Sequence, residues 1–173
     1  GGSNDEERFL QLAADDKGSI RYEGSTKIET NKWYDVAVVL DNSKSGSERI
    51  ALYVNGVRET LQLSSGTPDD LKEINLTSDF YIGQSDGKRR LNGAISYARI
   101  WTKALSDQQI SEQSGKLLSE DKDGMVANWL FNNGNGNTKT FVSLAGKSFE
   151  AEAANIVSSW KTDPILETST PTE

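Results

Sequence analysis

The sequence contains no cysteine and no histidine among its 173 residues. Without cysteine the chain has no disulfide framework, no thiol nucleophile and no cysteine-ligated zinc. Without histidine it lacks the commonest general base and the commonest ligand of transition metals. Any catalysis would therefore depend on carboxylates, lysine, tyrosine or serine. Any bound metal would be a hard cation such as calcium, held by oxygen atoms.

Long apolar runs and basic clusters are also missing. No apolar run approaches the roughly 20 residues that a membrane-spanning helix needs, and no signal peptide is visible. The net charge of −7 disfavours nucleic acid as a partner, because neutralising phosphates requires clustered Lys and Arg. The only tight basic group is Lys88-Arg89-Arg90. The acidic balance is typical of a solvated extracellular surface.

Apolar and polar residues alternate along most of the chain, and turn residues interrupt the alternation, which predicts short strands. The expected strands are 9–13, 19–22, 33–40, 49–54, 57–61, 79–83, 94–101, 125–131 and 141–144, with one or two more in 149–160. In 33–40 the residues that would point to either face of the strand are apolar, so this strand is expected to be central and covered on both faces. This many strands predicts an all-β, antiparallel β-sandwich.

Two local signals are more specific than the alternation. Asn55-Gly56 predicts a type I′ hairpin turn, since both central residues of that turn need positive φ. Ser106 and Gln109 form a capping-box pattern that predicts one short helix, with Gly115 as its stop.

Four segments follow one another in a fixed order: 33–41, 52–56, 80–83 and 91–106. Together they resemble the laminin G-like, concanavalin A-like jelly-roll domains of secreted bacterial proteins. The segment 124–137 is similar to an accessory element beside such domains in surface lipoproteins of Bacteroidetes-type bacteria. The resemblance implies a secreted or cell-surface bacterial location, with the export signal outside this sequence.

The same resemblance implies three parts. Residues 1–120 would form the laminin G-like sandwich, entered part-way so that its first strands are lacking or replaced. Residues 121–161 would form an accessory β segment that packs on the sandwich, and residues 162–173 a polar tail.

Carbohydrate sites stack sugars on aromatic faces and surround them with planar polar side chains. Tyr53, Tyr81 and Tyr97 alternate away from the expected core residues, and Arg99 follows two residues after Tyr97. These four are the expected ligand-binding residues, and the stronger alternative for each tyrosine is a partly buried packing residue. The four tryptophans are expected in the core, since they lie inside apolar runs: Trp33, Trp101, Trp129 and Trp160.

A calcium ion is a further expectation, at loop residues Asp41, Asn42 and Asp86. Related sandwiches often hold one calcium at a loop rim. No EF-hand spacing is present, and the alternative is that these are solvated turn residues.

Glucanases of this fold carry their carboxylates on one strand as Glu-x-Asp-x-x-Glu, and this string is absent. We therefore expect a non-catalytic binding module rather than an enzyme, with a glycan as its ligand. A structural or adhesive domain that contacts a cell-surface protein is the main alternative. A glycoside hydrolase of jelly-roll fold is the minor one.

Overall fold

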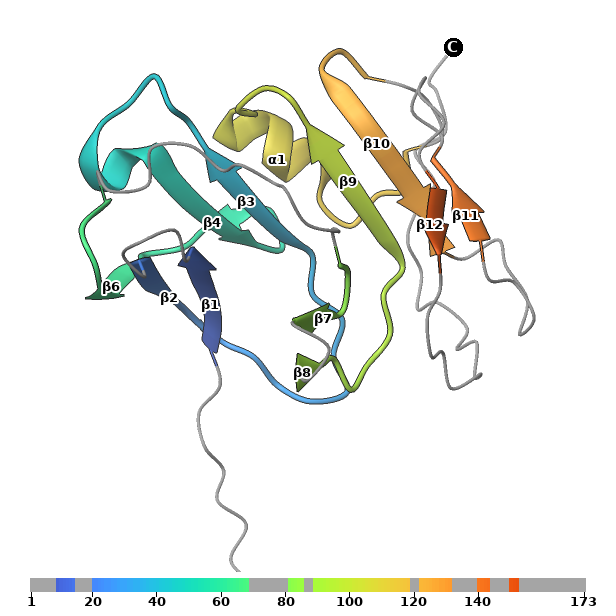
Figure 1. Ribbon diagram of the computed structural model, residues 1–173, viewed down its shortest axis with the longest axis horizontal. Helices are drawn as coiled ribbons and strands as arrows, with labels where there is room; N and C mark the ends of the chain where they lie inside the picture. The colour runs from blue at the N-terminus through green and yellow to red at the C-terminus, as the bar shows by residue number, and fades with distance from the viewer. Residues whose placement is uncertain are drawn as a thin grey trace, which may run out of the picture. The chain divides into compact units, whose positions relative to one another are not determined.

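The computed structural model describes residues 9–14, 20–68, 81–85, 89–118, 122–131, 140–143 and 150–152. In these residues the strands are β1 (Phe9–Ala14), β2 (Ile20–Lys27), β3 (Val36–Leu40), β4 (Ile50–Val54), β5 (Val57–Arg58), β6 (Gln62–Ser65), β7 (Gln84–Ser85), β8 (Arg89–Arg90), β9 (Tyr97–Trp101), β10 (Met125–Leu130), β11 (Thr140–Val142) and β12 (Glu150–Glu152). The helices are the 3-10 turn η1 (Gly46–Arg49) and α1 (Asp107–Gln113). All strand pairs in the described residues are antiparallel, which confirms the all-β prediction (Figure 1).

The chain divides into two compact units. The first comprises residues 1–75 and 104–115, and the second comprises residues 76–103 and 116–173. The predicted boundary at residue 120 and the predicted polar tail after residue 161 stay predictions.

The first unit is a sandwich of two three-stranded sheets, ordered β1-β2-β6 and β3-β4-β5. Its core joins Ile20 and Tyr22 of β2 to Ile50 of β4, each no more than 3% exposed. Leu12, Leu40 and Leu61 pack against this cluster. Burying apolar side chains between the sheets is the main favourable contribution to this layer arrangement.

β4 is buried along its whole length. Its Ile50 faces the core. Tyr53, on the opposite face, is also buried, and its hydroxyl bonds to Asp107 at the start of α1. The centre of the sheet is therefore β4, because β3 and β5 pair with its two edges.

The prediction that β3 is covered on both faces is wrong, and among the described strands β3 is an outer strand rather than a central one. Its Val36 and Val38 are 44% and 50% exposed. The strand alternates, so these valines share the face of Leu40, which reaches the core. The core face is thus covered at the Leu40 end only.

Trp33 is also 42% exposed, against the expectation of a core residue. It precedes β3 in a stretch with no regular structure, so strand alternation does not direct its ring inward. Trp129 is buried and Trp101 packs against a buried cluster, as expected, whereas Trp160 lies outside the described residues.

The hairpin and the helix form as predicted. Asn55 and Gly56 have φ of 51° and 76°, as a type I′ turn requires. The Ser106 hydroxyl accepts from the Gln109 N–H and the Gln109 side chain accepts from the Ser106 N–H, which completes the capping box. α1 lies against the hairpin, because a Cβ on Gly56 would stand 2.9 Å from the Ser114 Cβ.

β2 extends five residues beyond its predicted end, and β6 was not predicted. The polar half of β2 is held by the Glu59 carboxylate, whose Oε2 accepts from the backbone N–H of Ser25 and Thr26 at 2.7 and 2.6 Å. Thr26 also donates its hydroxyl to the Glu59 Oε1 at 2.6 Å. This long-range anchor replaces the apolar alternation that is absent there.

The second unit contains the pairs β9–β10, β7–β8 and β11–β12. Ala127 and Trp129 of β10 form a core with Ile82, Ala98, Ile100 and Phe131. Ile82 packs against this cluster, although residues 81–83, predicted as part of a strand, form a bend instead. Among the described residues, no helix has the length and hydrophobicity to cross a membrane.

Asn128 of β10 is completely buried in the second unit. Its Nδ2 donates to the Leu118 carbonyl at 2.7 Å, and its backbone N–H donates to the Ser143 hydroxyl at 2.8 Å. Buried polar groups need such partners, because an unpaired one incurs its full desolvation cost.

Candidate functional site

A cleft of about 640 Å³ opens on the face of β3-β4-β5 that points away from the sandwich core. Its floor is formed by Val39, Ala51 and Tyr53, which strand alternation and pairing place on one face. The loop after β3 closes one end, and the start of α1 with Arg58 of β5 closes the other. All the lining residues belong to the first unit.

The helix end of the cleft is built on a tyrosine–aspartate hydrogen bond. The Tyr53 hydroxyl donates to the Asp107 Oδ1 at 2.6 Å, and the Arg58 Nη1 lies 3.5 Å from the same oxygen. Tyr53 is 2% exposed, whereas the Asp107 side chain is 65% exposed. A buried residue thus fixes an aspartate that faces solvent, and that aspartate is paired with an arginine.

Burial, together with the hydrogen bond to Asp107 and the charge of that aspartate, raises the pKa of Tyr53 to about 12. All three disfavour the phenolate: burial by desolvation, the hydrogen bond because it needs the phenol proton, and the aspartate by its negative charge. At neutral pH the Tyr53 hydroxyl is therefore a donor, and it holds Asp107 as an acceptor.

The loop end contains Asp41, whose Oδ1 accepts from the Ser43 hydroxyl at 2.6 Å and from the Ser43 N–H at 3.0 Å. Lys44 Nζ lies 3.9 Å from the other carboxylate oxygen. The hydrogen bonds from Ser43 hold the pKa of the Asp41 carboxyl below its usual value, with Lys44 contributing less. Asp41 is therefore ionised at neutral pH and caps its own loop.

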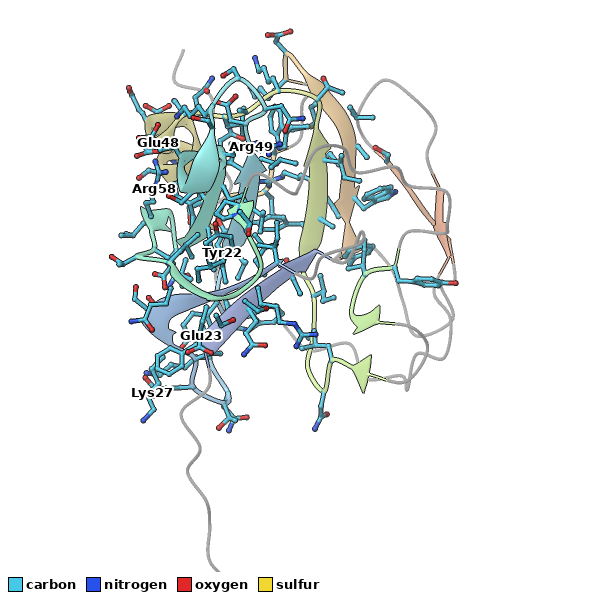
Figure 2. The ribbon with its side chains drawn as sticks, turned by 60° about the vertical axis from the view of Figure 1, so that its left-hand side comes forward. Tyr22, Glu23, Lys27, Glu48, Arg49 and Arg58 are labelled. Atoms are coloured by element: carbon cyan, nitrogen blue, oxygen red, sulfur yellow. The ribbon has the colours of Figure 1, made fainter. Side chains whose placement is uncertain are left out.

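Arg49 also lines the loop end and is only 8% exposed. Its Nη2 donates to the Asn42 Oδ1 at 2.7 Å, and its Nη1 to the Pro68 carbonyl at 3.5 Å. Figure 2 labels Arg49 with Glu48 and Arg58, the other charged lining residues that come from η1 and β5.

Of the four expected ligand-binding residues, the cleft contains only Tyr53. Tyr81, Tyr97 and Arg99 belong to the second unit, where Tyr81 is 52% exposed. Arg99 stacks on the Tyr97 ring with its guanidinium carbon 4.0 Å from the ring centre. The ligand-binding role of all four residues stays a prediction.

Arg99 also has polar partners within its own unit. Its Nε donates to the Asn128 Oδ1 at 3.4 Å, and its Nη2 donates to the Lys116 carbonyl. Two of its nitrogens are thereby occupied by the second unit itself.

The expected calcium ligands Asp41 and Asn42 lie side by side in the loop after β3, and Asp86 lies outside the described residues. The Asp41 Oδ1 accepts from Ser43 and the Asn42 Oδ1 accepts from Arg49, so each of these two oxygens already has a protein donor. Within the described ranges, no group of three or more acidic side chains is arranged for a metal. Calcium binding stays a prediction.

Sequence reasoning missed Arg49, Arg58 and Asp107 as site residues. Arg49 alternates with Ala51 and Tyr53 along the chain, so strand alternation could have placed it on the same face as those two residues. Asp107 had no such signal, because its contact with Tyr53 spans 54 residues of sequence.

A family model described as the concanavalin A-like lectin/glucanases superfamily, Laminin_G_3, matches residues 2–111. The chain belongs to this superfamily. No curated protein and no solved structure gave a significant match. The laminin G-like resemblance of the sequence is therefore confirmed, and every residue of the cleft lies inside the matched range. The superfamily takes its name from both lectins and glucanases, so membership alone leaves binding and hydrolysis open.

Proposed function

We propose that the protein is a non-catalytic glycan-binding module and that the cleft over β3-β4-β5 receives the sugar. The observation that carries the proposal is the lining of this cleft: a tyrosine floor with planar polar side chains at both ends. Sugar hydroxyls both donate and accept, and planar carboxylates, amides and guanidinium groups match them in pairs.

Preorganisation supports the same proposal. Asp107 is held by Tyr53 and Arg58, and Asp41 by Ser43, before any ligand arrives. Side chains that are already fixed lose less conformational entropy when a ligand binds. A volume of about 640 Å³ is within the range of small-molecule sites.

The lowered pKa of Asp41 favours binding over glycoside hydrolysis at the loop end of the cleft. A hydrolase needs one carboxyl group with a raised pKa to act as the general acid. The pKa of Asp41 is lowered instead, by Ser43 and Lys44.

A glycan array with the purified protein, followed by calorimetry, tests the proposal. Arg58→Gln removes the partner of Asp107 at the cleft and should weaken binding about threefold or more, as loss of one charged hydrogen bond predicts. Lys103→Gln is the matched control, because Lys103 pairs with Asp123 at 2.6 Å in the second unit, and it should leave affinity unchanged.

Two results would overturn the proposal. An array without any bound glycan would remove the binding half. Release of reducing sugar from β-glucan by the pure protein, lost in Asp107→Asn, would remove the non-catalytic half.

An adhesive role is the second candidate, favoured by the exposed valines of β3, which is an outer strand in the part of the sheet that the structure describes. Exposed apolar edge strands promote pairing between chains, and the occupant we propose is a second copy of this protein. Val38→Lys should then shift a dimer to monomer in sedimentation velocity. A wild-type monomer at high concentration would remove this candidate.

The proposed setting is the bacterial cell surface or the medium, as the sequence resemblance implies. Fractionation of the producing cells tests it, and recovery of the protein from the cytoplasm alone would contradict it.

A further inference from the structure

The cleft contains one buried cation whose charge no described carboxylate balances. Arg49 is 8% exposed, and both groups that accept from its guanidinium, the Asn42 amide oxygen and the Pro68 carbonyl, are neutral. Among the residues that the structure describes, no carboxylate lies within ion-pair distance of Arg49. A buried charge without a counter-ion is costly, so an arriving anion would be stabilised there.

The acidic side chains of the cleft are engaged elsewhere or exposed. Asp41 accepts from Ser43 and lies near Lys44, and Asp107 accepts from Tyr53 and Arg58. Glu48 precedes Arg49 in the chain and also lines the cleft, but it is exposed and forms no described ion pair with Arg49. Water therefore screens Glu48 more strongly than it screens the buried guanidinium.

Arg49 also retains the donors that an anion needs. A guanidinium has about five N–H groups in a planar fork. The bonds to Pro68 and Asn42 use one N–H of Nη1 and one N–H of Nη2, and the other N–H groups remain for a ligand. The fork geometry fits carboxylate and sulfate oxygens in pairs. Lys44 lies at the same end but is within ion-pair distance of Asp41, so Arg49 remains the cation for an arriving anion.

We propose that the glycan bound by this cleft is acidic, and that its carboxylate or sulfate group pairs with Arg49. The inference rests on the proposed function and specifies the chemical class of its ligand. It also assigns the two ends of the cleft, with the anionic group of the sugar at the loop end and its neutral hydroxyls at Asp107 and Arg58.

The first test changes the ligand and leaves the protein unaltered. Calorimetry compares a galacturonate oligosaccharide, its methyl ester, a sulfated galacto-oligosaccharide and a neutral galacto-oligosaccharide. We expect the free acid or the sulfated sugar to bind about tenfold or more tightly than the ester and the neutral sugar, as one charge-assisted pair predicts. The acid and sulfate arms identify which anion is preferred.

The second test changes the protein. Arg49→Gln should abolish the preference for the acid over its ester. Arg21→Gln should keep that preference, because Arg21 is an exposed arginine of β2 outside the cleft. Circular dichroism establishes that each variant is folded. If Arg49→Gln does not fold, the comparison of acid with ester on the unaltered protein still decides the ligand class.

The outcomes separate the two proposals. Equal affinity for acid, ester and neutral sugar would overturn the acidic class and leave glycan binding standing. A preference for the acid that survives in folded Arg49→Gln would overturn the assignment to Arg49. Failure of every sugar to bind would remove the proposed function itself, and this inference with it.

Discussion

Asn128 in the second unit and Tyr53 in the first are both buried polar residues, but their hydrogen bonds lead in different directions. Asn128 bonds to the Leu118 carbonyl and Arg99, groups that belong to its own unit. Tyr53 bonds to Asp107, which faces solvent at the rim of the cleft. Burial of a polar group thus supports stability in one unit and the position of a surface carboxylate in the other.

The two arginines extend this comparison. Arg99 stacks on Tyr97 and reaches a side-chain amide and a backbone carbonyl, so it holds parts of the second unit together. Arg49 lines an open cleft with neutral partners. The comparison separates a structural arginine from one available to a ligand, although both side chains carry the same charge.

The largest effect is expected from Asn128→Ala. The Leu118 carbonyl and the Arg99 Nε would lose their bonds to this side chain, and the free energy of unfolding should fall by about 3 kcal/mol. Urea denaturation measures it, with the exposed Asn92→Ala as the control, expected to change stability by less than about 0.5 kcal/mol. Equal effects of the two variants would contradict the structural role of Asn128.

Gly56→Ala should lower stability by about 2 kcal/mol, since φ is +76° and the new Cβ would stand 2.9 Å from Ser114. Gly46→Ala isolates the backbone term, because φ there is +57° and no atom lies within 4 Å, so about 1 kcal/mol is expected. Displacing α1 should also weaken glycan binding in Gly56→Ala only. Thermal denaturation and calorimetry compare the pair, and identical behaviour would show that α1 does not rest on the hairpin.

Glu59 predicts an acid-dependent loss of stability in the first unit. Burial raises the pKa of its carboxyl, but hydrogen bonds from Thr26 and Ser25 outweigh burial and lower the pKa below its usual value of 4.5. The folded-state pKa is thus below the unfolded one, so the stabilisation is present above the unfolded pKa and is lost as pH falls through the folded pKa.

The corresponding experiment is urea denaturation of wild type and Glu59→Gln across this acidic window. The variant should be less stable by about 1 kcal/mol at neutral pH, and the gap should close as the pH falls below about 4. A gap that is constant with pH would show that the ionised carboxylate does not anchor β2.

Tyr53→Phe should lower the free energy of unfolding by no more than about 1 kcal/mol, because only one hydrogen bond is lost and the ring remains. Its pKa of about 12 is raised above the unfolded value, so this contribution is present below the unfolded pKa and is lost as pH rises toward 12. Ultraviolet titration should show one phenol ionising near pH 12 in wild type that is missing in the variant. A titration curve unchanged by the substitution would remove the Tyr53–Asp107 bond from the account.

Local signals predicted the parts of the fold that local chemistry determines. Asn55-Gly56 and the Ser106–Gln109 capping box were sufficient because each satisfies backbone groups within a few residues. The exposed Val36 and Val38 were not predictable, since alternation indicates which residues share a face and not whether a second layer covers it.

The candidate site was less predictable than the fold. Tyr53 was identified because strand alternation places it on the face opposite the core residues, but its partner Asp107 is 54 residues away. The hydrogen bond between Glu59 and Ser25 likewise spans 34 residues. Arg99 looked like a ligand contact because sequence shows its position beside Tyr97 and not the Asn128 and Lys116 oxygens that receive its hydrogen bonds. Such pairings arise only when distant strands and loops meet.

Backbone NMR of the labelled protein, titrated with the tightest-binding oligosaccharide from the array, tests the central claim most directly. We predict amide shift changes at the cleft, in Ala51, Arg58 and Asp107, with those of Tyr97 and Arg99 unchanged. Shift changes confined to Tyr97 and Arg99, with the cleft amides unmoved, would contradict the assignment of the glycan to this cleft.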